Sequence, residues 1–171
     1  MGSRVFIRTP DEDDWSVLLD LHQRSADFHA PWVSLAQDER GCKRYIQRCQ
    51  AGTVEGLLIC HGVDQALVGV VNLSQIFYGG FQSAYLGYYV SVAYAGQGLM
   101  TEGVTLAINH AFTTLKLHRL EANIQPGNAD SLKLVARLGF TREGFSRQYL
   151  RVNGEWRDHE RWAMTVESWS P

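Results

Sequence analysis

The central stretch of the chain, where a strand runs through a glycine turn into a helix, constrains the fold more than any other feature. Ala84 to Val92 is rich in Tyr and Val and predicts a strand, Gly96-Gln97-Gly98 follows, and a helix is expected from about Met100 to Leu115. Glycines let the backbone approach a ligand, and the free N–H groups of a first helical turn attract anions. The stretch fits a pyrophosphate site, and an ordinary strand-to-helix turn is the alternative. No Gly-Lys-Ser/Thr follows, so it is not a P-loop.

The segments before this stretch indicate an antiparallel meander. Glu55 to His61 and Ala66 to Ile76 each predict a strand, with a turn at Gly62-Val63-Asp64-Gln65 between them. Consecutive strands joined by short turns favour antiparallel pairing. A dinucleotide-binding fingerprint requires a βαβ unit, so the glycines do not fit that class of site.

The segments after it require a different connection. Arg119 to Gln125 predicts a strand, Ala129 to Leu138 a helix, and Gly139-Phe140 the start of another strand. Such a succession needs a crossover, so at least one strand pair must be parallel. Tyr149 to Val152 and Trp156 to Val166 predict a hairpin, because Asn-Gly between them supplies the positive φ angles of a type I′ turn.

The N-terminal third is expected to hold one strand and two helices. Val5 to Arg8 predicts the strand. Four acidic residues, Asp11 to Asp14, suit a helix start because they complement its dipole, and this helix is expected to run to about Phe28. Asp38 to Gln50 predicts the second helix. No linker or repeat divides the chain, so residues 1–171 are expected to form one α/β domain.

Composition and charge exclude several classes of protein. A chain of 171 residues with 45% hydrophobic and 20% charged residues is typical of one globular domain. A net charge of −2 argues against a dedicated nucleic-acid binder. No apolar run suits a signal peptide or a membrane span, so a cytoplasmic protein is expected. The three cysteines form no C-x-x-C and the six histidines are dispersed, so neither a disulfide nor a metal site is expected.

Two later segments point to a family. They are Asn128-Ala129-Asp130-Ser131 and the run from Leu134 to Phe140, which ends in Leu138-Gly139-Phe140. Together with the strand, Gly-x-Gly and helix before them, they resemble the GNAT N-acetyltransferase superfamily over essentially the whole chain. The resemblance implies an α/β (α+β) GNAT fold: a central mixed, mostly antiparallel sheet of six to seven strands, a splayed central strand pair and about four helices.

Within the superfamily, the chain is similar to bacterial enzymes that acetylate the N-terminal alanine of ribosomal proteins. The similarity rests on Gly98-Leu99-Met100, His118-Arg119, Arg137-Leu138-Gly139-Phe140 and the segment from Gly154 to His159. It implies acetyl-CoA as co-substrate, no metal, and a protein or peptide N-terminus as acceptor, a ribosomal protein among them. It leaves the oligomeric state open.

The resemblance also assigns coenzyme-binding positions. The main chain of Tyr88, Tyr89 and Val90 would pair with the pantetheine arm, and Asn128 would hydrogen-bond to it. The pyrophosphate would lie against backbone N–H groups of Gly96, Gln97, Gly98, Leu99, Met100 and Thr101. Leu138-Gly139-Phe140 is expected to have only a structural role, closing one helix and starting the next strand.

Three positions depart from the superfamily pattern. Ala95 replaces the usual Arg or Gln, Met100 replaces a small residue, as in the ribosomal-protein subgroup, and Val135 replaces a tyrosine that often acts as general acid. Ser131, one helical turn earlier, is the substitute acid that the subgroup implies. The alternative is a serine at a helix start whose hydroxyl contacts the backbone or the coenzyme.

The general base is less clearly marked. Asn123 stands where related enzymes carry a glutamate, and an amide does not take protons. Glu121 lies two residues earlier on the same strand face, because side chains alternate with a period of two. It is expected either to act through water or to pair with a neighbouring arginine. An α-amine has a pKa near 7.7–8.0 and needs little basic assistance, which favours an α-amine over lysine as acceptor.

These features predict an acetyl-CoA-dependent N-acetyltransferase in which a protein N-terminal amine attacks the thioester directly. Backbone N–H groups near Val90 would polarise the thioester carbonyl. The loops that line the acceptor side in this superfamily are aromatic here rather than acidic. Two alternatives stay open: a small-amine acetyltransferase for aminoglycosides, polyamines or amino acids, and a non-catalytic acyl-CoA-binding protein.

Overall fold

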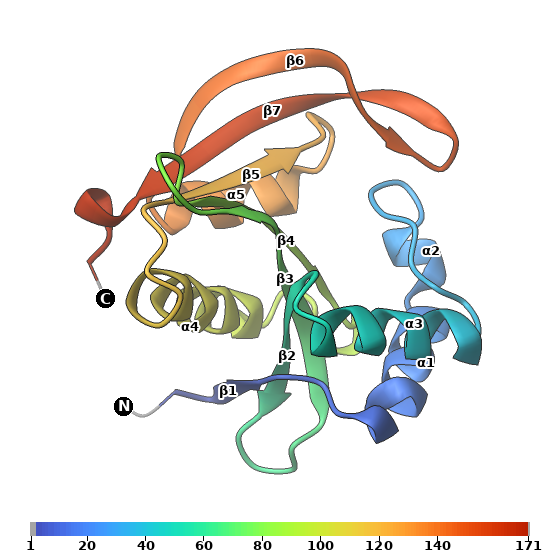
Figure 1. The fold of residues 1–171 in the computed structure, drawn as a ribbon. Helices are drawn as coiled ribbons and strands as arrows, with labels where there is room; N and C mark the ends of the chain where they lie inside the picture. Colours follow the sequence, from blue (N-terminus) through green and yellow to red (C-terminus); the bar gives the residue numbers. More distant parts are fainter. Residues whose placement is uncertain (1–2, 171) are drawn as a thin grey trace.

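Seven strands form one sheet in the computed structural model, which describes residues 3–170 (Figure 1). The strands are β1 Val5–Arg8, β2 Glu55–His61, β3 Leu67–Phe77, β4 Ser83–Val90, β5 Arg119–Ile124, β6 Thr141–Val152 and β7 Glu155–Thr165. Their order is β1-β2-β3-β4-β5-β7-β6, and every neighbouring pair is antiparallel except β4 with β5. The expected meander, crossover and mixed sheet are therefore confirmed.

Five α-helices lie among the described residues, rather than about four. They are α1 Trp15–Arg24, α2 Ala26–His29, α3 Glu39–Gln50, α4 Leu99–Thr113 and α5 Ala129–Arg137. The prediction of one helix from Asp11 to Phe28 was wrong. Its first residues form a short 3-10 turn, Glu12–Asp14, and Ser25 then separates α1 from α2. Ser25 is fully buried, and its hydroxyl accepts the Val92 N–H at 3.0 Å, so a tertiary contact fixes the break.

The C-terminal hairpin is longer than expected. The segment after α5 is one strand, β6, which keeps pairing with β7 through two register shifts. Asn153 and Gly154 have φ angles of 51° and 82°, as a type I′ turn requires. Gly139, with φ at 90°, ends α5 and lets the Phe140 N–H reach the Val135 carbonyl at 3.0 Å. The structural role expected of Leu138-Gly139-Phe140 is confirmed.

Apolar side chains pack on both faces of the sheet. Those of α4 and α5 cover one face, in a cluster that includes Val104, Ile108, Leu120 and Val135. Those of α1 and α3 cover part of the other face, in a smaller cluster that includes Leu18, Ile46 and Tyr89. Burial of such a side chain contributes roughly 1.5–3 kcal/mol relative to exposure. No helix among residues 3–170 is long and apolar enough to cross a membrane.

Strands β4 and β5 separate soon after they meet. They pair only from Ser83 to Tyr85 on β4 and from Arg119 to Glu121 on β5. Beyond these residues β4 pairs only with β3 and β5 only with β7, and the two strands diverge (Figure 1). This divergence, called the splay below, exposes an edge of β4, and the splayed pair that the sequence resemblance implies is thereby confirmed.

Candidate active site

The free edge of β4 presents the main chain of two residues to the splay. The Ser91 N–H bonds to the Val68 carbonyl of β3 at 2.8 Å, so the main-chain groups of Ser91 face β3. Because these groups alternate along a strand, those of Tyr89 also face β3, whereas those of Tyr88 and Val90 face the splay. The main chain of Tyr88 and Val90 is therefore placed for the expected pairing with pantetheine. Tyr89 instead contributes a buried side chain, whose hydroxyl lies 2.8 Å from His22 Nε2.

Helix α4 follows β4 after a short 3-10 turn, Val92–Tyr94, and the glycine turn, and its N-terminus is uncapped. Gly98 is the N-cap, has a left-handed φ of 77°, and provides no capping side chain for the first-turn N–H groups. Leu99 and Met100 point their side chains into the core, so only their backbone is available to a ligand. Free N–H donors at the start of a 15-residue helix form an anion site. The segment from Gly96 to Thr101 thus fits a pyrophosphate.

Met100 and Glu102 have partners that explain their presence in this turn. A Cβ on Gly69 would lie 2.6 Å from Met100 Sδ, so the glycine on β3 leaves the room that the methionine fills. The Glu102 carboxylate accepts a hydrogen bond from Arg4 Nε at 2.6 Å. The same guanidinium donates a hydrogen bond to the Gln97 carbonyl at 3.2 Å. Arg4 therefore links the start of β1 to the glycine turn. Ala95 precedes this turn in the sequence, at a position where the superfamily usually has a cation or an amide.

The start of α5 brings Asn128, Ser131 and Tyr88 together. The Asn128 side chain caps the helix by accepting the Ser131 N–H at 3.3 Å. The Ser131 hydroxyl lies 2.7 Å from the Tyr88 hydroxyl, on the face of the sheet covered by α4 and α5. Burial raises the pKa of Tyr88 to about 12, and the hydrogen bond to Ser131 opposes that shift. The phenol is therefore a proton donor at neutral pH.

Val135, at the position of the superfamily's tyrosine, is completely buried in the core. No proton donor stands there, whereas the Tyr88 phenol enters the same region from β4. The resemblance pointed to the main chain of Tyr88 and missed its side chain. The sequence signal available for this side chain was a tyrosine that alternates with buried strand residues. The contact with Ser131 had no such signal, because Ser131 lies 43 positions away and only the fold brings the two residues together.

Glu121 lies on the opposite face of the sheet from Ser131. Leu120, Ala122 and Ile124 fill the core beneath α4 and α5, so the alternating side chains of β5 face the other way. Glu121 accepts a hydrogen bond from Arg119 Nε at 2.9 Å, and Arg119 also pairs with Glu143. The sequence left open an ion pair for Glu121, and the structure has one. Ser131 and Glu121 are therefore not brought together.

Asn123 and Gly87 share that face, where β4 and β5 begin to separate. The Asn123 Oδ1 atom is buried and has no hydrogen-bond partner in the described part of the chain. A Cβ built on Gly87 would meet nothing within 4 Å, so open space lies beside β4 here. An unpaired acceptor at the position of the superfamily's glutamate can orient an amine, although it cannot deprotonate one.

The loop between α2 and α3, residues 30–38, is held by hydrogen bonds to the β6–β7 hairpin and to the residue that follows β5. The Ala30 carbonyl accepts from the Asn153 side chain, whose oxygen in turn accepts from Ser34, at the tip of the β6–β7 hairpin (Figure 1). The Pro31 carbonyl accepts from Gln125 Nε2 at 3.2 Å, just after β5. Elements far apart in sequence therefore close over the acceptor side of the splay.

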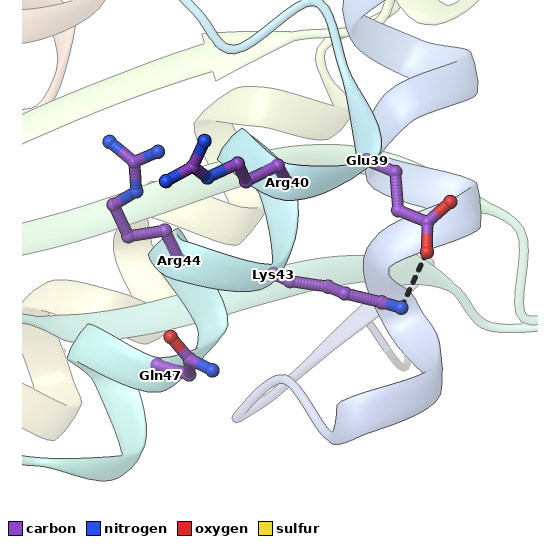
Figure 2. Close-up of a pocket in the computed structure, with 5 residues that line it drawn as sticks. All are labelled: Glu39, Arg40, Lys43, Arg44 and Gln47. Atoms are coloured by element: carbon purple, nitrogen blue, oxygen red, sulfur yellow. Dashed lines mark hydrogen bonds and ion pairs between the residues drawn. The ribbon is translucent and has the colours of Figure 1, made fainter.

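A surface hollow lies elsewhere, on the exposed side of α3 (Figure 2). Its lining residues are Glu39, Arg40, Lys43, Arg44 and Gln47, on the helix face opposite the buried Cys42 and Ile46. Lys43 pairs with Glu39 at 2.5 Å. The hollow faces away from the sheet and contains none of the residues discussed above. Within residues 3–170, no group of three or more His, Cys, Asp or Glu side chains is arranged to hold a metal ion.

Comparison with known protein families shows which family the chain belongs to. A family model described as "Acetyltransferase (GNAT) domain" matches residues 4–141, from the start of β1 into β6. The chain belongs to the GNAT acetyltransferase family. The matched residues include the glycine turn, the splayed strands and the start of α5, and the chain is a GNAT N-acetyltransferase.

This GNAT chain is also similar to individual N-acetyltransferases and to solved structures. It is 35% identical over 170 residues to the "[Ribosomal protein uS5]-alanine N-acetyltransferase" of Escherichia coli (strain K12), covering 94% of this chain and 87% of the relative. It is 32% identical over 167 residues to the "Probable N-acetyltransferase YjcK" of Bacillus subtilis (strain 168), covering 93% and 92%. The structure of "Mycobacterium smegmatis RimJ in complex with CoA-disulfide" superposes with a TM-score of 0.88 at 26% identity, covering 98% and 84%. The expected superfamily and subgroup resemblance is confirmed.

Proposed function

We propose that this GNAT enzyme transfers the acetyl group of acetyl-CoA to the N-terminal α-amine of a protein, a ribosomal protein being the first choice. The observation that carries the proposal is the 35% identity to a ribosomal-protein alanine N-acetyltransferase across 94% of the chain. The acceptor side supports it, because Glu121 there is paired with Arg119, which also holds Glu143, whereas a polyamine would call for a group of free carboxylates.

The donor side has the groups that coenzyme A needs. The uncapped N-terminus of α4 supplies N–H donors for the pyrophosphate, and Gly98 keeps side-chain atoms out of their way. Tyr88 offers main-chain groups to the amides of the pantetheine arm, and Val90 offers its N–H to the thioester carbonyl. Asn128 offers the amide N–H groups that its capping interaction leaves unused. These contacts would place the thioester in the splay, between β4 and β5, where it can be reached from both faces of the sheet.

The acceptor amine is proposed to attack from the face that carries Asn123 and Gly87. Asn123 Oδ1 would accept a hydrogen bond from the amine and orient its lone pair towards the thioester carbon. Attack forms a C–N bond and a tetrahedral oxyanion, which the Val90 N–H at the splay stabilises. Holding both reactants in this geometry supplies much of the rate acceleration.

Collapse of the intermediate breaks the C–S bond and releases the thiolate of coenzyme A. Ser131 is proposed to donate a proton to that sulfur and to take one from the Tyr88 hydroxyl 2.7 Å away, and solvent then returns a proton to the Tyr88 phenolate before the next turnover. The proton that the amine loses goes to water, since Glu121 is engaged by Arg119. An α-amine is deprotonated in substantial part near neutral pH, so water suffices for this step.

A library of peptides with free N-termini tests the acceptor directly. The enzyme is incubated with acetyl-CoA and the peptides, and acetylated products are identified by mass spectrometry. Peptides that begin with Ala or Ser should be modified at the α-amine, and blocking that amine should abolish the reaction. Faster acetylation of spermidine or of an aminoglycoside would contradict the proposal.

A further inference from the structure

His29 ends α2 and lies against the splayed strand. Its side chain is 6% exposed, and its Nε2 atom is 2.7 Å from the Val90 carbonyl oxygen. A carbonyl oxygen only accepts hydrogen bonds, so Nε2 carries the proton. Burial lowers the pKa of His29, which keeps the ring neutral and leaves a lone pair on Nδ1. That nitrogen is buried and has no partner within the described residues.

The bond from His29 reaches the edge of β4 that matters for catalysis. The Val90 C=O and N–H both point away from β3, as the bond between the Ser91 N–H and Val68 requires. His29 occupies the carbonyl and leaves the N–H free. Two residues further on, Ser25 holds the Val92 N–H at 3.0 Å. Ser25, between α1 and α2, and His29, at the end of α2, therefore hold the end of the strand at two points.

We infer that His29 is a positioning residue for acetyl transfer, which fixes the Val90 main chain so that its free N–H is preorganised towards the thioester oxygen. The inference rests on the proposed function, because it assigns a purpose to the oxyanion donor of that mechanism. A donor that is already in place costs no reorganisation when charge develops, and this is the source of oxyanion stabilisation. His29 acts through Val90 and does not touch the reacting atoms.

Three variants separate the two ring nitrogens. His29→Gln can place an N–H where Nε2 stands, His29→Asn keeps a polar group only near Nδ1, and His29→Leu removes both. Removing an oxyanion donor costs about 10²–10³-fold in kcat, so loosening one should cost about tenfold or more. We expect that loss in kcat for the Asn and Leu variants, a loss below about threefold for Gln, and little change in KM for acetyl-CoA.

His22→Gln is the matched control. His22, on α1, is also buried, but unlike His29 it is bonded through both nitrogens, to the Ala36 carbonyl and the Tyr89 hydroxyl rather than to the free edge of β4. Its replacement should lower the melting temperature without lowering kcat. A melting curve is recorded for every variant, so that a loss of folded protein is not counted as a loss of rate.

A measurement on the resting protein keeps this inference distinct from the proposed function. Long-range 15N–1H correlation spectra report the tautomer of each histidine, and His29 should be neutral with its proton on Nε2. The kinetics use whichever amine the wild type acetylates, so a wrong choice of acceptor leaves the comparison intact. Three results would overturn the inference: a proton on Nδ1, an unchanged kcat in His29→Leu, or equal losses in the Gln and Leu variants. A pH–rate profile altered in all three variants would make Nδ1 a base and overturn it as well.

Discussion

At the scale of single residues, the site combines a proton donor with an engaged carboxylate. Ser131 and Tyr88 form a hydroxyl pair on the coenzyme face, whereas Glu121 is held by Arg119 on the other face. In the proposed mechanism, the departing thiolate and the attacking amine are therefore served from opposite sides of the sheet. Ser131 and Glu121 are therefore expected to have different roles, and a substitution at each residue tests its role.

Replacement of Ser131 by Ala should lower kcat by about 10²-fold, the lower end of the range for a positioned acid, because a thiol is a good leaving group. The dissociation constant for acetyl-CoA should change little. Tyr88→Phe should lower kcat by a smaller factor, and the double variant should lose little more than Ser131→Ala, since the two hydroxyls act in series. Steady-state kinetics and calorimetry measure these quantities. A change in coenzyme affinity alone would make Ser131 a binding residue.

Glu121→Gln should leave the pH dependence of kcat/KM unchanged. The ion pair with Arg119 already engages the carboxylate, and the rate should rise with pH only as the substrate α-amine loses its proton near 7.7–8.0. Burial raises the pKa of Tyr88 to about 12, so its proton is retained and no fall in rate is expected below pH 10. If a titration seen in the pH dependence of the wild type disappeared in the Glu121→Gln variant, Glu121 would be the general base.

At the scale of elements, the N-terminus of α4 should carry most of the electrostatic affinity for the coenzyme. Gly98→Ala forces a side chain into a φ of 77° and to within 3.3 Å of Arg4, at the point where the helix must admit an anion. The rise in melting temperature that acetyl-CoA causes in the wild type should be strongly reduced in this variant.

Gly79→Ala is the control for backbone strain. Gly79 has a φ of 70° and open space around its Cβ position, in the loop between β3 and β4. Both substitutions should destabilise the free protein by roughly 1–2 kcal/mol, the cost of a left-handed residue with a Cβ. Only the Gly98 variant should lose the coenzyme-induced shift. Equal shifts in both variants would place the pyrophosphate elsewhere.

Local sequence patterns predicted most elements but not their junctions. The glycine turn, the Asn153-Gly154 hairpin and the Gly139 helix end depend on neighbouring residues, and each is confirmed by positive φ angles. The break at Ser25 depends on Val92, 67 positions away, so a helical pattern alone could not reveal it. The same holds within the site: the family resemblance indicated Ser131, but its phenol partner depends on how α5 packs against β4.

At the scale of the whole molecule, buried histidines link stability to pH. Burial lowers the pKa values of His22 and His29, which both lie beside Tyr89, and His22 is also close to the Cys42 thiol. Below about pH 6.5 the unfolded chain binds protons that the folded chain excludes, so stability is present above that pH and is lost as the pH falls.

The melting temperature should therefore drop between pH 7 and pH 5, by about 2–4 °C for each kcal/mol lost. His22→Gln removes one of the two groups and should make the pH dependence shallower, even though the variant is less stable at pH 7. Thermal denaturation across this range measures both effects. A slope identical to that of the wild type would show that His22 takes up its proton equally well in the folded and unfolded states.

The closure of the α2–α3 loop onto the β6–β7 hairpin and the end of β5 also belongs to this scale. Contacts from Asn153 and Gln125 hold the loop over the acceptor face, so that only a narrow chain end is expected to reach the splay. A flexible N-terminus meets that requirement. A lysine side chain also meets it in shape, but its pKa near 10.4 calls for a base that the site does not provide.

The central claim is tested most directly by one peptide that carries both kinds of amine. A peptide with a free N-terminal alanine and an internal lysine is incubated with enzyme and acetyl-CoA, and fragment masses locate the acetyl group. The account predicts acetylation of the alanine α-amine, with a kcat/KM well above that for spermidine under the same conditions. Acetylation mainly at the lysine, or a higher kcat/KM for spermidine, would contradict it.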